Sequence, residues 1–321
     1  MPQQQSHSFD LAILLVTIVL CGGVMFVAFQ PRDNSSAAAP PASPEIDTSD
    51  SNTLRRLPRT ARVATELLQQ PDIDRATLRS ALIRMATFKQ TEPETLLWEL
   101  IAGLTADSSA ALRRNLVRLV ADFPDRSTSE QRGQLKQLTG SANSPATQQV
   151  AFAAWIGLDK NIGAAFEHAR SNEQQLTEFL TALPMVESES VRRQASNSIR
   201  TLWQADSETS IRIQEQAVQT MVQLPGSATE KSSELIALLE ARRLRSAAIQ
   251  ALTDLPSASW SARDLGKLAA GLIAWIAEHP ADDRHSTSMA AAWELCEQLV
   301  PMLPEAKRER FQQRVDQLRV R

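Results

Sequence analysis

The sequence predicts an all-α protein, and three features of its composition and patterning support this class. The 321 residues include only ten Gly and no Tyr, and aromatic residues make up 5%, whereas β folds depend on turn glycines and strand aromatics. Ala, Leu, Arg, Gln and Glu dominate, and these residues lose little conformational freedom in a helix. After Leu54, amphipathic segments of about 10 to 18 residues follow one another, separated by short polar or Pro-containing breaks.

The first apolar segment, residues 11–29, is expected to be a transmembrane anchor behind a short N-terminal tail, residues 1–10. It contains no charged residue and is long enough to cross the hydrocarbon core of a bilayer as one helix. A cleaved signal peptide remains an alternative, although such a peptide carries basic residues before its apolar core and this tail has none. A lipid-attachment site at Cys21 is a second alternative, although Leu20 stands where such a site has a small residue.

Residues 30–53 are expected to form a disordered linker. They are rich in Pro, Ala and Ser and contain hardly any apolar residue that could be buried in a core. The remaining residues, 54–321, are expected to form one helical-repeat domain that this linker tethers to the membrane.

Signals for helix starts and stops divide residues 54–321 into segments. The stretches from Thr91 to Glu94 and from Ser127 to Glu130 have the spacing of a capping box. Five prolines each follow an apolar residue at the end of a periodic run, where a helix cannot continue. They are Pro124, Pro184, Pro225, Pro256 and Pro304.

An apolar residue followed directly by Arg recurs along the domain. The pairs are Leu78-Arg79, Leu112-Arg113, Val191-Arg192, Ile211-Arg212 and Leu244-Arg245. The interval from 78 to 112 is 34 residues and that from 211 to 244 is 33, while the middle intervals are irregular. Periods of this size are typical of arrays of helical hairpins, whose neighbours stack to share one core.

The stretch "LRSAAIQALTDLP" at residues 244–256 resembles the second helix of HEAT-type repeats most closely, and "ALRRNLVRLVADFP" at residues 111–124 is the next-best match. The resemblance implies an α-solenoid of HEAT-like helical hairpins. An irregular helical bundle remains the alternative.

A narrower resemblance covers residues 221–321. The run that begins "LPGSATEKSSELIALLEARRLRSAAIQALTDLP" and continues to "RFQQRVDQLRVR" is similar to the helical segment of planctomycete-type membrane-associated haem-binding proteins. The chain contains no C-x-x-C-H haem motif and no set of copper ligands, so the resemblance implies no redox role here.

Composition and motifs disfavour several classes of chemistry. The net charge is −3 without long runs of one sign, so no nucleic-acid partner is expected. Cys21 and Cys296 cannot build a disulfide framework or a structural zinc site, and Cys296 lies on an apolar helix face as an expected core residue. No phosphate-binding loop or nucleophile elbow is present, so we expect no catalytic site and no cofactor.

The stretch "EHPADDRH" gathers the only clustered candidates for metal ligands, His279, Asp282, Asp283 and His285. Its Pro and polar residues predict a solvated loop without a rigid scaffold, so no metal site is expected.

Tryptophans are the remaining large side chains to assign. Trp98 and Trp275 fall among Leu and Ile at helical spacing and are expected in the core. Trp260 stands between Ser259 and Ser261 at a helix entrance, so we expect it to be more exposed and take it as the candidate partner-binding residue.

These features predict a membrane-tethered helical-repeat scaffold that mediates protein–protein interaction and is not an enzyme. The alternative is a non-catalytic accessory subunit of a membrane-associated redox or degradative enzyme complex, which the second resemblance suggests. The distribution of basic residues around the anchor favours a cytoplasmic domain, whereas the spacer composition and the second resemblance favour the opposite side. We expect a single-pass protein with an extracytoplasmic, periplasmic helical domain.

Overall fold

The chain divides into two units, residues 1–46 and 47–321, in a computed structural model. The residues that the structure describes all belong to the second unit: 60–122, 128–204, 208–279 and 286–320.

The predicted N-terminal tail, membrane anchor and linker lie outside the described residues. Among the helices that the structure does describe, none combines the length and the apolar character that a bilayer crossing requires.

The described residues form helices and no strand, which confirms the all-α class. The α-helices are α2 (Ala61–Gln69), α3 (Arg75–Lys89), α4 (Pro93–Ala102), α5 (Ala110–Val120), α6 (Thr128–Leu138), α7 (Pro145–Asp159), α8 (Gly163–Ala169), α9 (Glu173–Ala182), α10 (Glu189–Arg200), α11 (Ile211–Gln223), α12 (Ala228–Glu240), α13 (Arg245–Thr253), α14 (Ala262–Glu278), α15 (Thr287–Leu299) and α16 (Glu305–Val320). Short 3₁₀ turns are η1 (Leu183–Met185), η2 (Thr201–Trp203), η3 (Ser257–Ser259) and η5 (Val300–Met302).

Helix ends follow from local capping chemistry. Ser109, Ser144 and Asp74 each accept a hydrogen bond from a backbone N–H in the first turn of the helix that they precede. Helices α9, α11 and α13 end within three residues of Pro184, Pro225 and Pro256, as predicted.

The capping box predicted at Thr91 is wrong. Helix α4 begins at Pro93 with Glu92 at the N-cap, and no side chain caps its first turn. The backbone N–H of Thr91 instead donates to Ala86 O (3.0 Å), next to Gln90 in a left-handed conformation. Thr91 therefore belongs to the turn that closes α3. The second predicted box includes Ser127, which lies outside the described residues.

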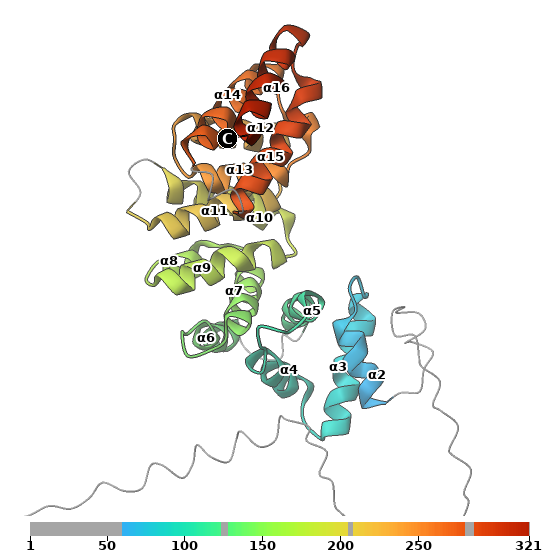
Figure 1. Ribbon diagram of the computed structural model, residues 1–321. Coiled ribbons are helices and arrows are strands. Elements are labelled where there is room, and N and C mark those ends of the chain that lie inside the picture. Colours follow the sequence, from blue (N-terminus) through green and yellow to red (C-terminus); the bar gives the residue numbers. More distant parts are fainter. Residues whose placement is uncertain (1–59, 123–127, 205–207, 280–285, 321) are drawn as a thin grey trace, which may run out of the picture. The chain divides into compact units, whose positions relative to one another are not determined.

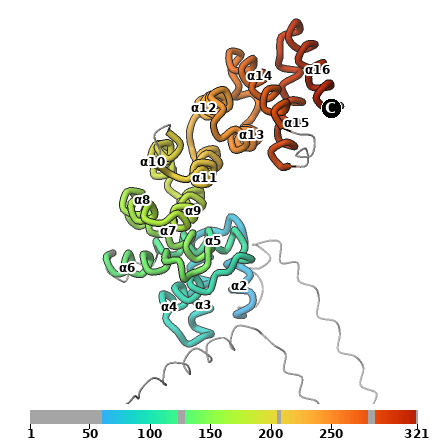
Figure 2. Tube along the Cα trace, turned by 60° about the vertical axis from the view of Figure 1, so that its left-hand side comes forward, coloured from blue at the N-terminus to red at the C-terminus, as the bar shows by residue number. Residues whose placement is uncertain are grey.

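Helices pair into hairpins along the chain, as Figures 1 and 2 show. The contacting pairs include α4 with α5, α6 with α7, α8 with α9, α10 with α11, α12 with α13, and α14 with α15. The second helix of each pair also packs against the second helix of the next, which gives one row from α5 through α7, α9, α11 and α13 to α15.

The core follows this row of helices. Phe152 of α7 and Phe179 of α9 are fully buried and meet edge to face, with ring centroids 5.7 Å apart. Trp98, Trp275 and Cys296 are also buried, which confirms their predicted core positions.

The apolar-Arg pairs do not share one structural position, so they are not a repeat register. Leu78 is the fourth residue of α3 and fully buried, whereas Ile211 is the first residue of α11 and 69% exposed. Leu244 precedes α13 in a left-handed conformation with φ 47°. Val191 lies in the first turn of α10 and Ile211 begins α11, and these two helices form a single hairpin, so the two residues cannot be equivalent positions in successive hairpins.

Candidate interaction grooves

Trp260 is buried, so the expectation that it is exposed is wrong. Only 5% of the residue is exposed, and its indole Nε1 has no hydrogen-bond partner among the described residues. It follows η3, where Ser232 Oγ of α12 donates to Ser259 O (3.1 Å). This bond holds the entrance of α14 against α12 and brings the indole into the core.

The candidate metal cluster is described only at His279. Its ring lies against Trp275, with centroids 4.1 Å apart, and its Nδ1 is 2.8 Å from Trp275 O. Asp282, Asp283 and His285 lie outside the described residues. Within the described ranges, no group of three or more His, Cys, Asp or Glu side chains is placed to hold a metal ion.

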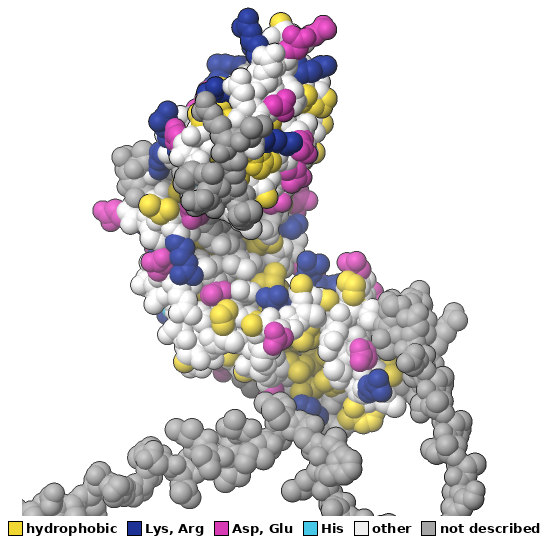
Figure 3. Space-filling model, viewed as in Figure 1, with side chains coloured by type: hydrophobic (Ala, Val, Ile, Leu, Met, Phe, Trp, Pro, Cys, Tyr) yellow, Lys and Arg dark blue, Asp and Glu magenta, His cyan; other side chains and the backbone are white. Residues whose placement is uncertain are grey.

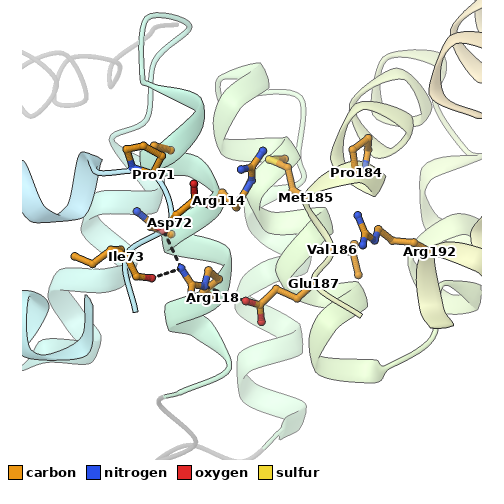
Figure 4. A pocket seen from close by; sticks show the side chains of 12 residues that line it. Pro71, Asp72, Ile73, Arg114, Arg118, Pro184, Met185, Val186, Glu187 and Arg192 are labelled. Carbon is orange, nitrogen blue, oxygen red and sulfur yellow. Dashed lines mark hydrogen bonds and ion pairs between the residues drawn. The ribbon is translucent and has the colours of Figure 1, made fainter. Parts of the chain in front are cut away.

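The first groove that the described helices enclose is open and has a volume of about 460 Å³. Figure 4 shows its three walls. They are the α2–α3 loop (71–73), the side of α5 that carries Arg114 and Arg118, and the segment from η1 into α10, including residues 184–187 and Arg192. We call it the α5 groove.

Side chains of α5 hold the α2–α3 loop in place. Asn115 is 2% exposed and its Nδ2 donates to Leu68 O (3.0 Å) and Gln70 O (2.9 Å), which satisfies carbonyls at the end of α2. Arg118 donates to Ile73 O (2.7 Å) from one turn further along α5. The loop itself turns through Asp72, which has a left-handed backbone with φ 57°.

An ion-pair network joins α5 to the start of α10. Arg118 Nε donates to Glu187 Oε1 (2.9 Å), and Arg75 of α3 contacts both Glu187 and Asp122. The carboxylate of Glu187 therefore bridges α3, α5 and the η1–α10 segment at the edge of the α5 groove.

Two arginines at the α5 groove are not part of that network. Arg114 lies on the α5 side and Arg192 on the α10 side in Figure 4. Neither has an ion-pair or hydrogen-bond partner among the described residues, and Arg192 Nε is buried without one. Asp72 is the other lining residue whose charge has no partner among the described residues. Because two unpaired arginines face one unpaired carboxylate, the lining has a net positive charge.

A second groove of about 440 Å³ lies between the start of α11, the α12–α13 turn and the end of α14. Arg242 and Leu244 in that turn both have left-handed backbones, a costly conformation for residues other than glycine. The guanidinium of Arg245 lies 2.6 Å from Glu278 and Arg242 contacts the same carboxylate. The hydrogen bond from Arg245 lowers the pKa of Glu278, and this one carboxylate is the partner of both arginines.

The face drawn in Figure 3 carries acidic and basic side chains interspersed among polar ones.

The chain matches no family model, no curated protein and no solved structure.

Sequence reasoning missed the α5 groove as a site. Its walls come from three segments that are far apart in the chain, and no local motif marks them. One signal was present, because Arg192 is the basic member of an apolar-Arg pair that the sequence analysis singled out.

Proposed function

We propose that this protein is a membrane-tethered helical-repeat scaffold that binds another protein through the α5 groove and carries out no catalysis. The observation that carries the proposal is the packing of successive hairpins, from α5 to α15, with an open groove built on their side chains. Proteins built in this way offer extended surfaces to other proteins.

The proposal includes a HEAT-like α-solenoid. The spacing of the second helices supports it. Helix α7 begins at Pro145, 35 residues after the start of α5 at Ala110, and α13 begins at Arg245, 34 residues after the start of α11 at Ile211. These spacings match the period of about 34 residues of the shorter helical-hairpin repeats, and HEAT repeats are longer, at about 40 to 47 residues. Other intervals deviate, so the proposed array is an irregular one.

The proposal also places the anchor at residues 11–29, the linker at 30–53 and the helical domain outside the cytoplasm. Protease added to intact spheroplasts should then degrade residues 54–321. Protection in intact spheroplasts, together with digestion after lysis, would show the opposite orientation.

Affinity purification of the full chain from its native membranes tests the function. The comparison is between wild type and Ala111→Trp, which places a large side chain at the mouth of the α5 groove where Ala111 is only half-buried. We expect a specific protein to co-purify with wild type and to be depleted with the variant, at equal thermal stability. Equal recovery with both would exclude the groove as the site, and recovery of no protein in either case would contradict the scaffold function.

A further inference from the structure

We propose that the segment bound in the α5 groove is an extended acidic peptide of the partner protein, with at least two carboxylates. This inference rests on the proposed function and adds the chemistry of the partner. Its basis is the pair of guanidinium groups of Arg114 and Arg192 on opposite walls of one groove.

The two guanidinium groups are available to a ligand. Arg192 lines the groove, and no described residue accepts a hydrogen bond from its side chain, so a carboxylate in the groove would give this guanidinium a partner. Arg114 is exposed on the facing wall, and no described residue pairs with it. Arginine offers a planar fork of donors that matches a carboxylate, and such charged hydrogen bonds are stronger than neutral ones.

Apolar side chains beside the arginines favour a peptide over a free anion. Met185 and Val186 lie on the same wall of the α5 groove as Arg192, and Met185 is only half-buried, so apolar surface is available there. An extended peptide places alternate side chains on opposite sides. It can therefore direct carboxylates to the arginines while its apolar side chains cover Met185.

The scale of the groove agrees with a short segment. Sites for small ligands typically measure about 300 to 1,000 Å³, and the α5 groove falls within this range at about 460 Å³. The second groove differs because each of its three arginines has a partner: Arg242 and Arg245 both contact Glu278. Arg243 donates to the carbonyls of Trp203 and Gln204.

Asp72 supplies an internal control. It lines the same groove, it is exposed, and no described residue neutralises it. A bound acidic peptide would be repelled by this carboxylate, so Asp72→Asn should strengthen binding while leaving the two arginines in place.

Selection from a displayed library of random eight-residue peptides tests the inference. The full-length chain is purified in detergent, and the double variant Arg114→Ala/Arg192→Ala serves for counter-selection. We expect enrichment of peptides with two or more Asp or Glu alternating with apolar residues. Fluorescence anisotropy with the most enriched peptide then gives Kd for wild type and for each single variant.

Arg192→Ala should weaken binding about ten- to a hundredfold, since one charged hydrogen bond contributes about 1.5 to 3 kcal/mol. Asp72→Asn should strengthen binding about twofold or more. The matched control is Arg193→Ala on the same helix, because Arg193 pairs with Glu189 away from the groove. This control should leave Kd unchanged.

Enrichment of neutral or basic peptides, no enrichment at all, or a Kd that ignores Arg114 and Arg192 would overturn the acidic-peptide inference. If a partner still co-purifies in a manner sensitive to Ala111→Trp, only this inference fails. If no partner co-purifies, the proposed function itself fails.

Discussion

Cys296 illustrates how burial sets chemistry at the scale of one residue. It is fully buried in α15, and burial raises the pKa of its thiol to about 12. The thiolate is the reactive form, so the thiol should be inert in the folded chain. In a Cys21→Ser background, we predict no modification of Cys296 by iodoacetamide at pH 8 until denaturant is added. Rapid modification without denaturant would contradict the burial.

The same thiol predicts a pH dependence of stability. Its pKa in the folded chain lies above the ordinary value of 9.0, so the folded state holds the proton more tightly. The resulting stability is fully present below pH 9 and is lost as pH rises from 9 through 12. Between pH 8 and pH 10, urea unfolding should show a loss of about 1.4 kcal/mol that Cys296→Ala lacks. An identical loss in both proteins would assign the effect to other groups.

Predictions about single residues succeeded where the surrounding helix decided the outcome. Trp98, Trp275 and Cys296 stand among apolar residues at helical spacing, and all are buried. The prediction that Trp260 is exposed was wrong, because it relied on the flanking serines, which suggested an exposed turn. Its burial depends on the contact between Ser232 and the turn before α14, which adjacent sequence does not encode.

At the scale of helices, α12 and α14 approach closely at Gly271. A Cβ at this glycine would lie 2.8 Å from Leu239 Cγ and Cδ2, whereas one at Gly266 of the same helix would meet only Lys307 Nζ at 3.8 Å. We predict that Gly271→Ala lowers the free energy of unfolding by about 1 to 3 kcal/mol. Gly266→Ala should raise it by about 0.5 to 1 kcal/mol, because Ala favours the helix interior. Chemical denaturation measures the free energy of unfolding of both variants. An equal increase in both would mean that α12 and α14 are further apart at Gly271.

Helix α13 tests whether the row of second helices shares a core. Ala248 is fully buried in it, whereas Ala237 of α12 is exposed. Ala248→Asp should bury an unpaired charge and cost several kcal/mol, on the order of 3 or more. Ala237→Asp, the same chemical change at an exposed position, should change the free energy of unfolding by no more than about 0.5 kcal/mol. Thermal unfolding checks the pair; similar melting of the two variants would contradict the shared core.

The sequence predicted that the chain is helical and where several helices end, but not how the hairpins align. Prolines such as Pro225 and Pro256 act locally, so their effect can be read from neighbouring residues. The apolar-Arg pairs occupy different positions because the turns before the helices differ. Leu244 shows this, since its left-handed backbone places it outside the helix that it was expected to begin.

At the scale of the whole molecule, the α5 groove could not be predicted because it exists only after folding. Asn115 and Arg118 of α5 donate hydrogen bonds to the carbonyls of Gln70 and Ile73, which hold the α2–α3 loop at the groove. Arg118 also donates to Glu187 of the η1–α10 segment. These contacts join residues 45 to 69 positions apart in the chain. Of the residues singled out in advance, Arg192 lies in the groove, and Trp260 lies in the core.

Site-specific photo-crosslinking in the native cells tests most directly whether the α5 groove binds a protein. A small alkyl-diazirine amino acid replaces Met185 in the groove or, as the control, exposed Ala237 of α12. We predict that illumination yields one dominant crosslinked protein from position 185 and not from position 237. Crosslinks of equal yield at both positions, or none at position 185 in a protein that is folded and fully expressed, would contradict the proposed role of the groove.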